Sequence, residues 1–183
     1  NLRLNLNDRQ SWRNWLLNNH TSQKECWLAV SRSANGKNLL YLDAVEEALC
    51  FGWIDSTTKC ADGITYQRFS PRRKTSHWTE LNKERVRRLE RLGLMTDAGR
   101  ATLPADLNNP FIIEADILDL LQSDPIVWQN FQNFPPLYQR IRIGNIQYYR
   151  HRKLEYQNKL NRFITETRKN NIFGDWHDNG RLL

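Results

Sequence analysis

The residues best suited to chemistry in this chain lie between Phe51 and Asn82, where arginines alternate with aromatic residues. A guanidinium group can hold a phosphate or a carboxylate through two parallel hydrogen bonds, and an aromatic ring offers a face for stacking or for a cation. The alternative is structural, because aromatic residues fill cores and arginine stems cover apolar surface. The ligand-binding residues that we predict are Trp53, Asp55, Tyr66, Arg68, Arg72, Arg73, Trp78 and Asn82.

Two carboxylates in this stretch, Asp55 and Asp62, could serve as an acid and a base if the chain brings them beside Tyr66 and Arg68. Asp62 precedes Gly63, however, and an Asp-Gly pair between two extended runs is typical of a hairpin turn. Asp55, at the start of a strand, could equally accept backbone N–H bonds or pair with Arg68 or Lys59. An enzyme that uses Asp55 therefore stays an open alternative, and no catalytic residue is identified.

The common catalytic and cofactor-binding signatures are absent from the sequence. It contains no GxxxxGK[ST], GxGxxG, HExxH or GxSxG. Each of the four histidines stands alone, and Cys26, Cys50 and Cys60 have no CxxC spacing. We therefore predict no cofactor and no metal, and the free thiols favour a reducing, cytoplasmic compartment.

The charge of the chain favours an anionic partner, since the formal net charge is +7. Residues 68–91 hold nine Lys and Arg against three acids, residues 140–169 hold nine against two, and residues 97–124 hold one arginine against six acids. A helix near residues 79–92 would place Arg87, Arg88 and Arg91 on one face, which makes nucleic-acid binding the second hypothesis. The structural alternative is that solvated basic helices fold against the acidic segment. A small anion, an acidic protein surface and a nucleic acid all remain candidate partners, and the oligomeric state is not predicted.

The supporting elements follow from capping, periodicity and turn signals. Asn7 or Asp8 can cap a helix that ends before Thr21, and Asp43 with Glu46 resembles a capping box. Residues 26–30 predict one strand, and residues 53–69 predict a hairpin. The further helices that we predict span about residues 79–92, 96–103, 114–122, 125–132, 137–150 and 153–169.

These elements predict an α+β fold with a small antiparallel sheet and helices, followed by an α-helical C-terminal half. Residues 1–103 would form the α+β core, and residues 104–183 a helical extension packed on it, so that 183 residues make one compact domain. No apolar run approaches the roughly 20 residues that a membrane helix needs, so we expect neither a membrane span nor a signal peptide.

Several ordered motifs resemble those of a known family. They are EEALCFGWID at residues 46–55, QRFSPRR at 67–73, Ser-His-Trp at 76–78 with Asn82, Gly-Leu-Met-Thr at 93–96 and Ala-Gly at 98–99. In this order they resemble the bacterial YdeI/OmpD-associated family, often called bacteriocin-protection proteins, over residues 8–103. Three features depart from the family pattern. Ser56 stands where the family has glycine, IRIGNIQ at residues 141–147 stands where the family usually has W-I-x-x-A-K, and the Glu-Thr-Arg run at 166–168 comes late.

The resemblance implies a bacterial, mostly cytosolic protein connected with envelope stress and with tolerance of antimicrobial peptides or bacteriocins. It implies no particular reaction. We therefore expect a non-enzymatic binding or stress-tolerance protein that uses the arginine and tryptophan cluster to hold an anion.

Overall fold

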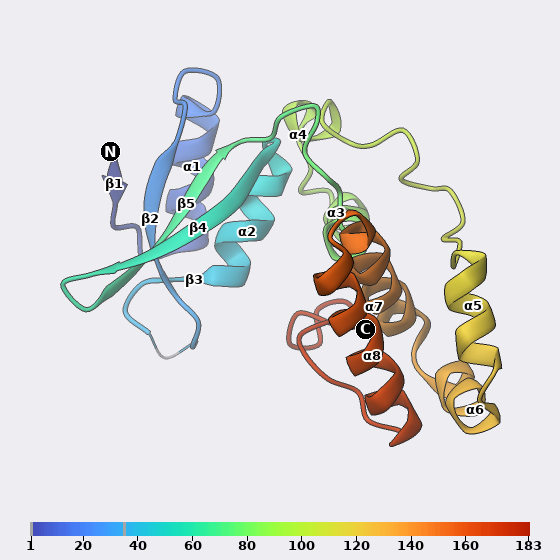
Figure 1. The fold of residues 1–183 in the computed structure, drawn as a ribbon. Helices are drawn as coiled ribbons and strands as arrows, with labels where there is room; N and C mark the ends of the chain where they lie inside the picture. The colour runs from blue at the N-terminus through green and yellow to red at the C-terminus, as the bar shows by residue number, and fades with distance from the viewer. Residues whose placement is uncertain (1, 35) are drawn as a thin grey trace. The chain divides into compact units, whose positions relative to one another are not determined.

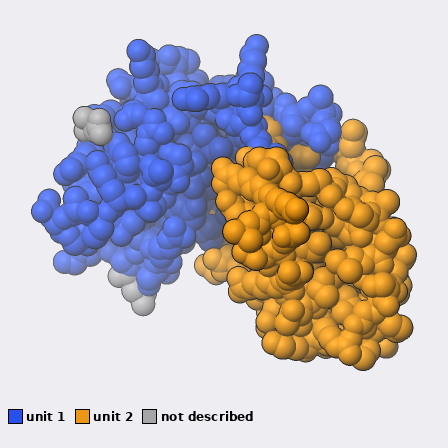
Figure 2. Space-filling view, in the orientation of Figure 1, with its two compact units in different colours: residues 1–77, 85–107 blue, residues 78–84, 108–183 orange. Residues whose placement is uncertain are grey.

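The structure, a computed structural model, describes residues 2–34 and 36–183 and divides the chain into two compact units. Figure 2 colours the first unit, residues 1–77 and 85–107, and the second, residues 78–84 and 108–183. Helix α3 (Glu80–Arg91) contributes its first turn to the second unit and the rest to the first. The predicted α+β class, with a helical C-terminal half, is confirmed (Figure 1).

The sheet belongs to the first unit and has its long strands in the order β2 (Cys26–Ser31), β5 (Ile64–Pro71) and β4 (Trp53–Ala61). These three strands pair antiparallel, as predicted. Two short strands that we did not predict, β1 (Arg3–Leu4) and β3 (Leu39–Leu40), both pair parallel with β2 and make the sheet mixed. Two-residue strands leave no periodic pattern in a sequence, so only the fold reveals them.

The β4–β5 hairpin turns at the predicted Asp-Gly pair. Asp62 has φ 53° and Gly63 has φ 73°, the left-handed conformations that a two-residue hairpin turn requires. Between Asp55 and Thr58 the register shifts by one residue, so β4 carries a β-bulge. A bulge bends the strand and redirects the side chains beside it, which here include Ser56.

One face of the sheet packs against α1 (Arg9–Asn19) and α2 (Tyr41–Cys50). Trp12 of α1 is fully buried, and its ring centre lies 5.5 Å from that of Phe69 on β5. Asp8 caps α1 by accepting a hydrogen bond from the backbone nitrogen of Ser11 at 2.8 Å. The predicted cap therefore falls on Asp8 of the two candidates.

The predicted capping box of α2 is wrong. The helix begins at Tyr41 after Leu40, and no side chain caps it. Asp43 and Glu46 instead bind arginines, because α1 lies alongside α2 and brings Arg9 within 3.2 Å of Asp43 and 2.7 Å of Glu46. The two residues of the local capping pattern are therefore engaged in ion pairs with a distant segment, and they do not cap the helix.

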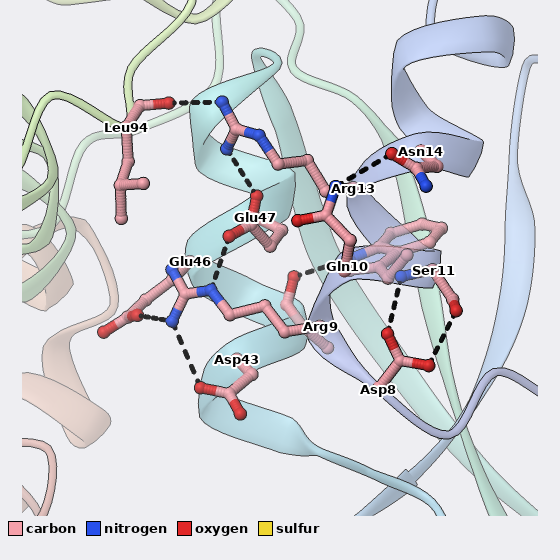
Figure 3. A network of polar contacts seen from close by, with 12 residues as sticks. Asp8, Arg9, Gln10, Ser11, Arg13, Asn14, Asp43, Glu46, Glu47 and Leu94 are labelled. Atoms are coloured by element: carbon pink, nitrogen blue, oxygen red, sulfur yellow. Dashed lines mark hydrogen bonds and ion pairs between the residues drawn. The ribbon is translucent and has the colours of Figure 1, made fainter.

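This ion-pair network, which we call the α1–α2 network, is centred on two buried glutamates (Figure 3). The side chains of Glu46 and Glu47 are each 1% exposed. Glu47 pairs with Arg9 at 2.5 Å and with Arg13 at 2.7 Å, and Arg13 also donates to the carbonyl of Leu94 at 2.9 Å. Buried charges persist when they are paired and hydrogen-bonded, so the network is a structural joint between the two helices.

The second unit is helical, with α5 (Ala115–Gln122), α6 (Pro125–Asn133), α7 (Pro136–Tyr148), η1 (Tyr149–His151) and α8 (Lys153–Arg168). Its core combines aliphatic and aromatic residues: Tyr138 and Phe163 are buried, and Phe131 is in edge contact with Phe163. The predicted C-terminal helices agree with these elements closely, because the apolar positions repeat at helical spacing and Pro136 begins α7.

Candidate functional site

A pocket of about 740 Å³ lies at the end of β5 in the first unit. Its lining comes from the segment after α1, the first half of β4, the end of β5 and the loop that follows. The lining residues are Thr21, Ser22, Gln23, Lys24, Ile54, Asp55, Ser56, Arg68, Ser70, Pro71, Arg73 and Ser76. We call this the basic pocket, since three of its four charged residues are cationic. Its volume is typical of small-molecule sites, which range over about 300–1,000 Å³.

Arg68 is placed by the pairing of β5 with β2. It lies opposite Trp27, one position before the buried Phe69, so its side chain is on the face of the sheet away from α1. Its guanidinium group donates to Glu25 Oε2 from Nε at 2.9 Å and from Nη2 at 2.5 Å. The hydrogen bond from Arg68 holds the pKa of the Glu25 carboxyl below its usual value. Arg68 is therefore held firmly in place, with its Nη1 directed to Ser56 Oγ at 3.3 Å.

Arg73 and Lys24 supply the exposed positive charge of the basic pocket. Both side chains are exposed, and neither forms an ion pair within residues 2–34 and 36–183. The carbonyl oxygen of Arg73 accepts the backbone N–H of Ser76 at 3.0 Å, so a tight turn brings Ser76 back to the pocket. The result is two uncommitted cations beside several hydroxyl groups, which can donate hydrogen bonds to an oxyanion.

Asp55 lines the basic pocket, yet its carboxylate is committed to α2. Tyr41 Oη donates to Asp55 Oδ2 at 2.8 Å, and Arg32 lies over the Tyr41 ring with its Cζ 4.2 Å from the ring centre. Burial, together with the charge of Asp55, raises the pKa of Tyr41 well above its ordinary value. Arg68 pairs with Glu25, so the expected pairing of Asp55 with Arg68 does not form. The arrangement supports a structural role for Asp55.

Arg72 lies inside the protein, in contrast to Arg73. It is 9% exposed, and its Nη1 donates to the carbonyl of His77 at 3.1 Å. Burial lowers the pKa of Arg72 to about 10, against the favourable charge of Asp55. The two neighbouring arginines thus divide between the interior and the pocket, which sequence spacing alone does not distinguish.

Two of the predicted aromatic residues belong to the core. Trp53 is 1% exposed and donates from Nε1 to the carbonyl of His20 at 3.2 Å. Tyr66 packs with Trp27 in a small cluster on the side of the sheet that carries Arg68, and its hydroxyl lies 3.4 Å from Asn5 Oδ1. Neither residue lines the basic pocket.

The remaining predicted residues lie elsewhere. Trp78 and Asn82 belong to the second unit, at and near the start of α3. Of the arginines proposed for nucleic acid, Arg88 binds buried Glu46 at 2.7 Å and Arg87 donates to the carbonyl of Leu107, while Arg91 is exposed. At least two of the three charges are therefore engaged within the protein.

Several residues of the basic pocket were not predicted. Lys24, Ser56 and Ser70 join Arg68 and Arg73 because the bulge in β4 and the segment after α1 meet at the end of β5. A run of polar residues after a helix looks like an ordinary loop, so the sequence offered no signal for the Thr21–Lys24 side of the site.

The part of the chain that the structure describes contains neither a cluster suited to a metal ion nor a helix suited to a membrane. Among residues 2–34 and 36–183, no three His, Cys, Asp or Glu side chains gather in a way that could hold a metal ion. No helix among these residues has both the length and the apolar character that crossing a bilayer requires.

Comparison with known families gives one match. The model of a domain of unknown function (DUF8412) matches residues 4–102, just over half of the chain. The chain therefore belongs to the DUF8412 family, and the whole basic pocket lies within the matched region. Comparisons with curated proteins and with solved structures give no match.

Proposed function

We propose that this protein binds a small anionic metabolite in the basic pocket and carries out no reaction on it. The observation that carries the proposal is the lining, in which Lys24, Arg68 and Arg73 outnumber the single carboxylate of Asp55, itself bound to Tyr41. Arg68 is oriented in advance by Glu25, whereas Arg73 and Lys24 remain available to close on a ligand. A preorganised cation lowers the entropic cost of binding.

We further propose, from the resemblance to the YdeI/OmpD-associated family, that binding serves stress tolerance in a bacterial cytoplasm. The motifs behind that resemblance flank the pocket: EEALCFGWID runs through α2 into β4, and QRFSPRR runs along β5 to Arg73. The alternatives are a nucleic-acid partner and an enzyme that uses Asp55. The pairing of Arg88 with Glu46 weighs against the first, and the bond from Tyr41 to Asp55 weighs against the second.

The test is a thermal-shift titration with inorganic phosphate, a mononucleotide, citrate and a short oligonucleotide. Arg73→Gln and Lys24→Gln remove the free cations, and Lys74→Gln is the matched control, because Lys74 is exposed and lies outside the lining. A ligand at 100 times its Kd stabilises the folded state by about 2.7 kcal/mol. For a protein of this size that corresponds to a rise of about 5–11 °C in Tm.

We expect at least one of the three small anions to raise Tm in the wild type and in Lys74→Gln, and to lose most of this effect in the two pocket variants. A comparison of the Tm shifts caused by phosphate and by citrate distinguishes recognition of a phosphoryl group from recognition of a carboxylate. If none of the three small anions stabilises the wild type more than it stabilises the two pocket variants, the site is refuted. Binding of the oligonucleotide alone, unaffected by Arg73→Gln, would favour the nucleic-acid alternative.

A further inference from the structure

A second, smaller pocket lies in the second unit, outside the region that matches the family. Its volume is about 120 Å³, and it lies between α7, α8 and the C-terminal segment. Three basic side chains line it, Arg142 from α7 with Lys159 and Arg162 from α8. Asn145 contributes an amide, and Phe173 contributes a ring. No carboxylate is among the lining residues, so we call it the tribasic pocket.

Aromatic rings contact all three cations of the tribasic pocket. Phe173 contacts two guanidinium groups, with Arg142 Cζ 5.0 Å and Arg162 Cζ 4.2 Å from its ring centre. Lys159 Nζ lies 4.4 Å from the centre of the Tyr149 ring. Cation–π contacts orient a basic side chain but leave its charge without a counterion. The positive charge in the tribasic pocket is therefore concentrated and only partly compensated.

Within residues 2–34 and 36–183, none of the three cations forms an ion pair. Glu166 binds Lys169 at 3.5 Å and Asn171 at 2.6 Å. Asp175 accepts a hydrogen bond from Arg142 Nη2 through its backbone oxygen at 3.2 Å, and its charge only partly compensates that of Arg142. Burial, with a contribution from the charge of Arg162, lowers the pKa of Arg142. Like charges held at such short range repel one another unless an anion neutralises them.

Arg142 also has unused hydrogen-bonding capacity. Its Nη2 donates to the carbonyl of Phe173 at 2.6 Å, but its Nε is buried and has no hydrogen-bond partner in the described chain. A buried donor without a partner costs about 1–3 kcal/mol, so such a group in a native protein calls for an explanation. Gly174 preserves the arrangement, since a Cβ there would lie 2.3 Å from Arg142 Nη2.

We propose that the tribasic pocket binds one tetrahedral oxyanion, either free inorganic phosphate or the terminal phosphoryl group of a small molecule. With a volume of about 120 Å³, the tribasic pocket has room for a phosphoryl group. Three cations match the charge and the several acceptor oxygens of a phosphate. The site is independent of the basic pocket, and it assigns a function to the helical half of the chain.

The test follows the Arg142 Nε–Hε signal by ¹H–¹⁵N NMR during titration with inorganic phosphate, at ionic strength held constant with sodium chloride. Lys159→Gln combined with Arg162→Gln removes two pocket charges. Lys153→Gln combined with Lys169→Gln removes two charges from the same helix region outside the pocket. The mutated side chains reach the surface, and circular dichroism verifies that both double variants are folded.

We expect a saturable shift of the Arg142 signal in the wild type and in the control variant, with affinities that agree within twofold. The pocket variant should bind phosphate at least tenfold more weakly, whereas Arg73→Gln in the basic pocket should bind it normally. Titration with methyl phosphate distinguishes the two possible ligands. Binding as tight as that of inorganic phosphate indicates that the pocket takes the phosphoryl group of a small molecule, and weaker binding indicates that it takes the free ion. An unmoved signal, equal losses in both double variants, or binding of an oligonucleotide alone would overturn the proposal.

Discussion

Substitution of Glu47 by Gln should destabilise the protein more than any exposed charge substitution of equal size. Glu47 is 1% exposed and forms two ion pairs, with Arg9 at 2.5 Å and with Arg13 at 2.7 Å. Glutamine has nearly the same shape, so the substitution removes charge and one acceptor oxygen without leaving a cavity. Arg9 keeps Asp43 and Glu46 as partners, and Arg13 keeps the carbonyl of Leu94.

The magnitude follows from the burial of each partner. Removal of one member of a fully buried pair costs about 3–5 kcal/mol. Arg9 and Arg13 are 31% and 26% exposed, so solvent screens part of the interaction and the arginines remain hydrated after the substitution. We therefore expect a loss of about 2–3 kcal/mol in the free energy of unfolding, an increase of about 30- to 140-fold in the unfolding equilibrium constant.

Urea unfolding followed by tryptophan fluorescence measures this loss, and Tm should fall by about 4–12 °C. Glu90→Gln is the control, because Glu90 is 50% exposed and pairs with an Arg100 that is 44% exposed. Because solvent screens both partners, that pair should contribute little to the free energy of unfolding. Equal losses for the two variants, or a loss below about 1 kcal/mol for Glu47→Gln, would show that the α1–α2 network does not stabilise the fold.

Two further predictions concern Gly99 and the cysteines. Gly99→Ala should destabilise the protein by about 1–3 kcal/mol in thermal unfolding, because the new Cβ would lie 2.3 Å from the carbonyl oxygen of Cys50. An unchanged Tm would show that α4 (Asp97–Arg100) can shift away. Burial raises the pKa of Cys26 and of Cys50 from 9.0 to about 12. Their neutral thiols therefore stabilise the fold fully below about pH 9, and this stability is lost as the pH rises towards 12. With a thiol reagent at pH 8, exposed Cys60 should react at once and the two buried cysteines only on unfolding; rapid reaction of all three would contradict the buried placement.

The sequence alone was enough to predict the elements whose signals are local. The Asp62–Gly63 turn, a cap at Asn7 or Asp8 and the helix near residues 153–169 each depend on neighbours within a few residues. All three appear in the structure, with Asp8 as the cap. The α+β class follows from these local signals, because an antiparallel hairpin and amphipathic helices have few ways to bury their apolar faces.

The tertiary structure decided which charged residues are free to bind a ligand. Arg72 and Arg73 are adjacent and chemically identical, yet one lies inside the protein and the other lines the basic pocket. The partners of Asp55 and Arg68 come from residues 14 and 43 positions away, Tyr41 and Glu25. Such pairings depend on how separate segments meet, and local patterns carry no information about them. Composition and spacing therefore indicated the chemistry available to this chain, whereas long-range packing determined where that chemistry is exposed.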